Sequence, residues 1–346
     1  MPRASRGMTA RDQFLAMAFA QITFRESLRD IEACLLGCAH RYAMGIRGNI
    51  TRTNLAYANE RRDWRVFEAL GQILIRKARR LYADDTNGLN LNEMVYAVDA
   101  STIDLCLSMF PWAHFRRTKA AVKLHTQIDL TGSIPVFMRI TEGSVHDVNF
   151  MDQMSIEAGS IYVFDRGYLD FARLFRIETA NGYFVIRAKS NTKFHVLESR
   201  RVDKATGLRC DQIVRLSTRK GKRDYPLPLR RISYVDAETG KRLSFLTNHF
   251  DHPPIVIPAI YKSRWQIELF FKWIKQNLRI KAFFGTSDNA VRTQIWIALC
   301  VYLMVACLNK IHRIDESLSR ILQILSVNVF QKVPFNQLLV DFTEES

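Results

Sequence analysis

The sequence lacks the patterns that mark several common classes of protein. Neither GxxxxGK(S/T) nor GxGxxG occurs, so no nucleotide or dinucleotide cofactor is expected. None of the six cysteines forms a CxxC pair, which favours buried, reduced thiols in a cytoplasmic protein. A zinc site formed by Cys34, Cys38 and His40 is the less favoured alternative.

A secretory signal and a transmembrane segment are also missing. The N-terminal residues have no apolar stretch of the signal-peptide kind. The apolar run Ile295–Leu308 has 14 residues and is too short to cross a bilayer. We therefore predict a buried helix at this run, a cytoplasmic location and no membrane partner.

Acidic residues are scarce relative to basic ones. The chain has 50 Lys+Arg against 34 Asp+Glu, a formal net charge of +16. Residues 1–82 carry a net charge of +8 and residues 187–242 carry +10, whereas residues 83–186 between them carry −5. The basic blocks indicate a nucleic acid partner. The acidic centre indicates carboxylates gathered for a cation.

The period of the apolar residues changes along the chain and predicts a mixed α/β fold. Residues 9–82 have a helical period, and residues 189–250 alternate strand-like runs with turns. Between them, three strands in series precede a strand–helix–strand unit, which indicates a mixed sheet with helices on its faces. The predicted strands are Val95–Ala100, Ala121–Leu130, Ile134–Thr141, 161–165 and Gly182–Ala188, and the helix is Asp170–Thr179.

The basic helical segment at the N-terminus is a candidate for DNA contact. A helix-turn-helix reader would bring Arg61 and Arg62 near phosphates. A helical platform with solvated arginines is the alternative, and the sequence leaves both open.

The stretch Tyr261–Gly285 is predicted to be one helix that presents a polar arc. At about 100° per residue, an arc of about 60° holds a phenol, a carboxylate and two cations. Apolar residues, including Ile267 and Phe271 on one side and Trp265 and Leu269 on the other, are expected to wall this arc. It is either a solvated face with i,i+4 ion pairs or a metal-binding acid with cations for phosphate. The four polar residues are Tyr261, Arg264, Glu268 and Lys275.

Two aspartates lie at the ends of predicted strands, Asp99 in AVDAS and Asp165 in YVFDRGY. Aspartate is disfavoured in strands, and functional sites are built at this edge of α/β sheets. Either residue alone fits a turn or a cap. Together with Glu268 they would repel one another unless a hard divalent cation, Mg²⁺ or Mn²⁺, bound between them. Two such ions can serve phosphodiester chemistry.

The spacing Tyr261-x2-Arg264-x3-Glu268-x6-Lys275 resembles the signature of the IS-four family of bacterial insertion-sequence transposases, of the DDE class. The motifs AVDAST and YVFDRGY resemble the two aspartate motifs of that family. Residues 13–35 and 54–65 resemble the helical leader domain of one subgroup. The resemblance covers nearly the whole chain.

The resemblance implies a ribonuclease-H-like mixed sheet flanked by helices, an all-helical N-terminal domain and a β-rich insertion. The implied domains are a DNA-contacting helical domain at 1–88, a catalytic core at 89–188 and 251–346, and a basic insertion at 189–250. It implies that the catalytic, metal-binding triad is Asp99, Asp165 and Glu268. It implies DNA contacts for Tyr261, Arg264 and Lys275, to which we add Lys272, Arg166, His146, Arg61 and Arg62.

The implied reaction is metal-dependent cleavage of double-stranded DNA at terminal inverted repeats, followed by strand transfer into target DNA. It would use Mg²⁺, with Mn²⁺ as a substitute, as two ions, and a homodimer would bridge two element ends. The alternative is a catalytically inactive DNA-binding remnant or inhibitor. The short leader before Asp12 would favour that alternative.

Overall fold

A computed structural model describes residues 8–331, except 39–41, 43, 47–49, 86–87, 90, 117–118 and 281. The chain forms two compact units. We call the first the helical unit; it comprises Met1–Tyr82, Ile103–Val122 and Phe271–Ser346. We call the second the sheet unit; it comprises Ala83–Thr102 and Lys123–Phe270.

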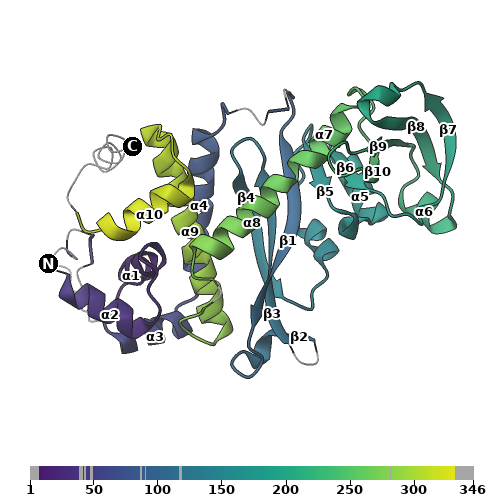
Figure 1. The fold of residues 1–346 in the computed structure, drawn as a ribbon. Helices are drawn as coiled ribbons and strands as arrows, with labels where there is room; N and C mark the ends of the chain where they lie inside the picture. The colour runs from purple at the N-terminus through teal and green to yellow at the C-terminus, as the bar shows by residue number, and fades with distance from the viewer. Residues whose placement is uncertain are drawn as a thin grey trace. The chain divides into compact units, whose positions relative to one another are not determined.

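The helical unit is built around one buried helix, α9 (Asp288–His312), as Figure 1 shows. It packs against α1 (Ala10–Ile22), α3 (Arg52–Arg61), α4 (Arg65–Leu81) and α10 (Leu318–Asn328), and α2 (Leu28–Gly37) packs on α1 and α3. Helix α9 is long and apolar enough to cross a membrane, but 83% of its most apolar window is buried inside the protein. The predicted buried helix is therefore confirmed.

Close approach of α4 to α9 depends on a glycine. A Cβ atom at Gly71 would lie 3.0 Å from two ring atoms of Trp296, which is among the largest fully buried side chains. A side chain at this position would have to push the Trp296 ring aside.

The sheet unit holds a mixed sheet whose strands pair in the order β4-β3-β1-β5-β6. Strands β1, β5 and β6 are parallel, and α5 (Phe171–Thr179) connects the last two. This order confirms the expected ribonuclease-H-like sheet. The bounds are β1 Val95–Leu105, β2 His114–Arg116, β3 Lys119–Asp129, β4 Ile134–Glu142, β5 Ile161–Phe164 and β6 Tyr183–Arg187.

The basic segment after β6 is rich in strands, and it continues the same sheet. Strand β10 (Arg242–Thr247) pairs antiparallel with β6, and β9 (Leu229–Val235), β8 (Leu208–Leu216) and β7 (Phe194–Arg200) follow. A short helix, α6 (Arg219–Asp224), lies between β8 and β9 in the chain.

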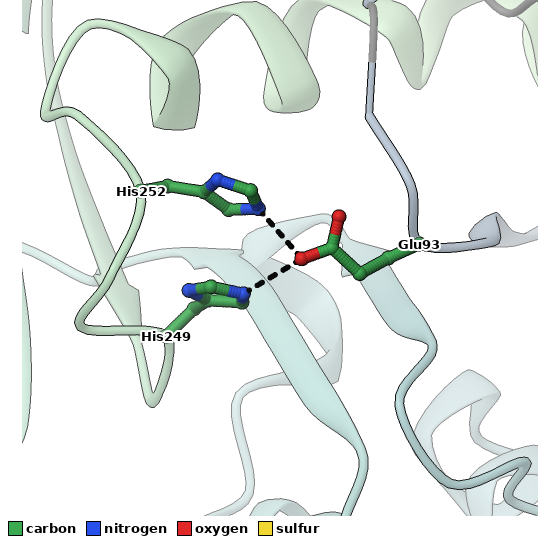
Figure 2. A group of neighbouring side chains, drawn as sticks. All are labelled: Glu93, His249 and His252. Atoms are coloured by element: carbon green, nitrogen blue, oxygen red, sulfur yellow. Dashed lines mark hydrogen bonds and ion pairs between the residues drawn. The ribbon is translucent and has the colours of Figure 1, made fainter.

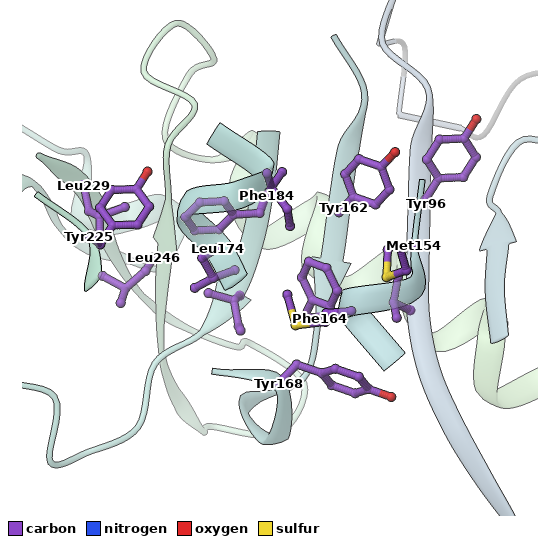
Figure 3. Packing of buried hydrophobic residues seen from close by; sticks show 14 of the residues in the cluster. Tyr96, Met154, Tyr162, Phe164, Tyr168, Leu174, Phe184, Tyr225, Leu229 and Leu246 are labelled. Atoms are coloured by element: carbon purple, nitrogen blue, oxygen red, sulfur yellow. The ribbon is translucent and has the colours of Figure 1, made fainter. Parts of the chain in front are cut away.

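An apolar cluster fills one face of the sheet unit, as Figure 3 shows. All four residues of β5 are buried, as expected for a strand with parallel neighbours and both faces covered. The cluster also joins the core to the added strands, because Phe184 of β6 packs edge-on against Tyr225 at 6.1 Å. Its largest fully buried members are Tyr96, Tyr162, Phe164, Phe184 and Tyr225.

The single helix predicted for Tyr261–Gly285 is wrong. The structure has α7 (Val256–Ser263) and α8 (Trp265–Asn277), with Arg264 between them. The Arg264 N–H donates to the Tyr261 carbonyl and the Ile267 N–H donates to the Arg264 carbonyl, so the chain tightens to i→i−3 bonds there. The polar arc also lacks one expected apolar wall, because Trp265 and Leu269 are exposed, whereas Ile267 and Phe271 are buried.

We expect Gly71→Leu to destabilise the helical unit by about 1–3 kcal/mol, because the new side chain must displace the buried Trp296 ring. Urea denaturation followed by circular dichroism measures the effect. Gly37→Leu on α2 is the matched control, since nothing lies within 4 Å of its Cβ position. Equal stability of the two variants would contradict the close packing of α4 on α9.

Candidate functional site

The sheet brings Asp99 and Asp165 to one edge. Strands β1 and β5 are parallel neighbours, and the last pair in their register is Val98 with Phe164. Asp99 is the next residue of β1, which continues to Leu105 rather than ending near Ala100 as predicted, and Asp165 directly follows the end of β5. The buried part of β1 ends at Val98, so both carboxylates lie where the apolar interior gives way to polar surroundings.

Arg264 joins two of the three predicted acids. Its Nη1 donates to Asp99 Oδ2 at 2.8 Å, and its Nη2 donates to Glu268 Oε1 at 2.5 Å. Arg264 sits at the junction of α7 and α8 and Glu268 one turn later, which is why one guanidinium reaches both carboxylates.

Tyr261 contacts the third acid. Its hydroxyl donates to Asp165 Oδ1 at 3.2 Å, and the Arg264 guanidinium lies 5.8 Å from the centre of its ring. The structure therefore brings Asp99, Asp165 and Glu268 together with Tyr261 and Arg264. All five belong to the sheet unit.

The electrostatics of this group are those of crowded acids held by one cation. Burial raises the pKa of Asp99; Arg264 lowers it, and the charges of Asp165 and Glu268 raise it further. Burial alone would lower the pKa of Arg264, but the charge of Asp99, the neighbouring Tyr261 and the contact with Glu268 together outweigh this and raise it. Burial and the neighbouring Asp165 raise the pKa of Tyr261.

The donor set fits a hard divalent cation. Two carboxylates bond one guanidinium, the third, Asp165, is near enough for its charge to raise the pKa of Asp99, and carboxylate oxygens are the ligands that Mg²⁺ and Mn²⁺ prefer. The site is also reachable, since the Glu268 side chain is 35% exposed and that of Asp99 is 23% exposed.

The other predicted DNA contacts lie in three places. His146 and Arg166 are exposed in the sheet unit, Arg166 directly after Asp165. Lys272 and Lys275 follow Glu268 on α8 by four and seven residues, a spacing that shares one helix face.

Arg61 and Arg62 lie at the end of α3 in the helical unit. The Arg61 guanidinium lies 5.9 Å from the Tyr57 ring centre. Arg62 donates hydrogen bonds to the carbonyls of Met8 and Thr9 and to Gln13 Oε1. It therefore links the end of α3 to the start of α1. Cys34 contacts Arg25 and Asp30. His40, the histidine of the less favoured zinc site, lies outside the described residues.

Sequence reasoning missed a basic cavity of about 550 Å³ in the sheet unit. One basic residue of its lining directly follows Asp165. The others come from β6, from the loop that follows β6, and from β9 and β10. Only their separate positions are visible in the sequence, because pairing of β6, β10 and β9 brings them together. The basic residues are Arg166, Arg187, Lys189, Arg231 and Arg242.

Asp99→Asn should change how stability depends on pH. The pKa of Asp99 is raised from 3.8, so the folded chain holds this proton more tightly than the unfolded chain. That stabilisation is complete below about pH 4 and is lost as the pH rises through the raised pKa. The variant, which cannot lose this proton, should therefore gain stability relative to the natural chain from pH 4 to 7.

Urea denaturation in the presence of EDTA, at a series of pH values, measures this difference. Asp104→Asn, at an exposed carboxylate, is the control and should give no such trend. A stability difference for Asp99→Asn that does not vary with pH would contradict the raised pKa.

Comparison with known proteins assigns the chain to a family. Residues 91–304 match the family described as Transposase DDE domain, and residues 2–47 match a domain of unknown function, DUF4372. The chain is 34% identical over 286 residues to "Putative transposase y4zB" of Sinorhizobium fredii, covering 80% of this chain and 77% of that protein.

Two further likenesses are more distant. The chain is 30% identical to "Probable transposase for insertion sequence element IS5377" of Geobacillus stearothermophilus, covering 69% of this chain and 62% of that protein. A piggyBac transposase synaptic complex with hairpin DNA aligns with a TM-score of 0.48 and 10% identity, over 99% of this chain and 78% of that chain. DDE transposases use divalent metal ions, and no finding favours an inactive remnant. This chain belongs to the DDE transposase family and is a transposase of a bacterial insertion sequence.

Proposed function

We propose that Asp99, Asp165 and Glu268 are the catalytic, metal-binding triad of this transposase. The observation that supports this is the single guanidinium of Arg264, which bonds Asp99 and Glu268 while Tyr261 bonds Asp165. Three acids from two parallel strands and a helix are thereby held at one edge of the sheet. The reaction is cleavage of double-stranded DNA at the terminal inverted repeats and joining of the 3′ ends to target DNA.

Mg²⁺, for which Mn²⁺ can substitute, is the proposed cofactor, as two ions held by the three carboxylates. Bound there, such ions activate the attacking hydroxyl and stabilise the leaving oxygen. The carboxylates supply the oxygen donors, and burial, followed by the charges of Asp165 and Glu268, raises the pKa of Asp99, which a bound cation would lower.

Arg264 takes two roles in this proposal. Before the carboxylates bind metal, its guanidinium neutralises Asp99 and Glu268 and keeps them in position. With a cation bound to these carboxylates, the guanidinium would be available to a DNA phosphate, which it can bind through two N–H groups. Tyr261 orients Asp165 in the same way, through its hydroxyl.

We propose that the basic cavity binds the DNA backbone beside the triad. Arg166 both lines the cavity and follows Asp165 in the chain, so a strand held there lies next to the acids. Among the described residues that line it, none is acidic. The Phe194 ring, with the Arg231 guanidinium 4.8 Å from its centre, offers a face on which a base can stack.

The remaining DNA contacts in the proposal are those of α8 and the helical unit. Lys272 and Lys275 continue the face of Glu268 along α8, and His146 and Arg61 are exposed. Arg62 contributes indirectly, by holding the start of α1. A homodimer that bridges two element ends, in the bacterial cytoplasm, completes the proposal.

Glu268→Gln should reduce Mg²⁺-dependent strand cleavage by roughly a hundredfold or more, because it removes a ligand charge but little volume. DNA binding should persist. Cleavage is measured on end-labelled DNA that carries the element termini, and binding is measured by a gel-shift assay. Glu198→Gln, at an exposed carboxylate on β7, is the control and should cleave normally. Normal cleavage by Glu268→Gln would refute the triad.

Lys189→Gln and Arg242→Gln should each weaken DNA binding and flatten its salt dependence. Loss of one phosphate contact changes the slope of log K against log salt by about 0.9. The slope is measured by fluorescence anisotropy between 50 and 200 mM salt, concentrations over which such contacts produce a large change in affinity. Arg215→Gln, an exposed residue of β8 outside the cavity, should leave the slope unchanged. An unchanged slope in both cavity variants would exclude the cavity as a DNA contact.

A further inference from the structure

A second group of ligand-type side chains lies in the sheet unit, as Figure 2 shows. Glu93 stands just before β1, and His249 and His252 stand between β10 and α7. The side chains of both histidines point at the carboxylate of Glu93. None of the three belongs to the proposed triad.

The distances within this group are those of a metal coordination shell. The Nε2 atoms of His249 and His252 lie 3.2 and 3.1 Å from Glu93 Oε1, and one ligand atom from each residue lies within 4.8 Å of the others. Nitrogen and oxygen ligands at about 2.05 Å from a tetrahedral Zn²⁺ lie about 3.3 Å apart. The ligand atoms therefore need to move little to accept an ion.

Hydrogen bonding alone leaves this group incomplete. The contact between His252 Nε2 and Glu93 does not satisfy that nitrogen, which is buried without a hydrogen-bond partner. His249 Nδ1 is also buried and unpartnered. The two imidazole rings stack at 4.0 Å with an interplanar angle of 17°, so both present their nitrogens to the same space. A metal ion would give His252 Nε2 the partner that it lacks.

Hydrogen bonds from a buried arginine fix the backbone of the segment that carries the two histidines. Arg230 pairs with Asp211 through two hydrogen bonds of 2.9 and 2.8 Å, and both side chains are almost fully buried. The Nη1 atom of Arg230 donates to the carbonyls of His249, Phe250 and His252, the last at 2.6 Å. This support fixes the backbone of both candidate ligands before any ion binds.

We propose that Glu93, His249 and His252 bind a Zn²⁺ ion, with a water molecule as the fourth ligand. Two imidazoles and one carboxylate suit Zn²⁺, whereas the all-carboxylate triad suits Mg²⁺, so the two sites select different metals. The ion would link the residues just before β1 to the loop just before α7. Strand β1 carries Asp99, and α7 carries Tyr261. The ion would thereby close a loop of 156 residues that contains the added strands.

The test uses the full chain, freed of metal with a chelator and titrated with Zn²⁺ and with Co²⁺. We expect about one Zn²⁺ per chain, a higher melting temperature and a Co²⁺ absorption spectrum of tetrahedral type. His252→Ala and Glu93→Gln should each weaken Zn²⁺ binding by about tenfold or more and should abolish the rise in melting temperature.

Three controls keep the outcome clear. His195→Ala, at an exposed histidine of β7, should bind Zn²⁺ normally. The double variant Asp99→Asn, Glu268→Gln should also bind it, which separates this site from the triad. Glu93→Gln keeps the side-chain shape, and circular dichroism establishes that it is folded. Failure of the natural chain to bind Zn²⁺, or binding by Glu93→Gln and His252→Ala that is as tight as that of the natural chain, would overturn the proposal.

Discussion

The guanidinium of Arg264 is the cation on which the arrangement of acids depends. Asp99 and Glu268 are brought together by separate elements, and the charge of Glu268 raises the pKa of Asp99. Hydrogen bonds of 2.8 and 2.5 Å from one planar group supply both charge and direction. A lysine at this position would offer a point charge but would lack the two-pronged geometry that spans the carboxylates.

The sheet supplies the rest of the geometry. Parallel pairing of β1 with β5 fixes the distance between Asp99 and Asp165 through backbone hydrogen bonds, which side-chain motion does not change. The tightened turn at Arg264 then separates α7 from α8. Tyr261 at the end of α7 thus meets Asp165, while Glu268 in the first turn of α8 meets Arg264.

Much of this site could be predicted because it depends on local patterns. A strand that is followed by aspartate is visible in a few residues, so the sequence predicts β5 and β6 to within about one residue at each end. Strand β1 begins at Val95 as predicted but continues to Leu105, beyond the predicted end at Ala100, so Asp99 lies inside this strand. The apolar period around Ile267 and Phe271 likewise predicts their burial. The break at Arg264 was missed because no proline or glycine marks it.

Other features depend on contacts that no short window contains. Glu93 and His249 are 156 residues apart, and only the pairing of the added strands with β6 brings them together. The His-x-x-His spacing after a strand was the one local signal of that group. The basic cavity has the same origin, since Arg187, Arg231 and Arg242 lie on three strands whose order the sequence does not specify.

Pairing of β10 with β6 also has a consequence for how such a segment could be gained or lost in evolution. Its outermost strand, β7, is mostly exposed, whereas β8 contributes Val214 and Leu216 to the apolar cluster of the sheet unit. Deletion of the whole segment would leave Val185 and its neighbours on β6 with unpaired N–H and C=O groups, an open edge that favours aggregation. A lineage that shortened the segment would therefore have to retain β10, or cover the exposed edge of β6 in another way.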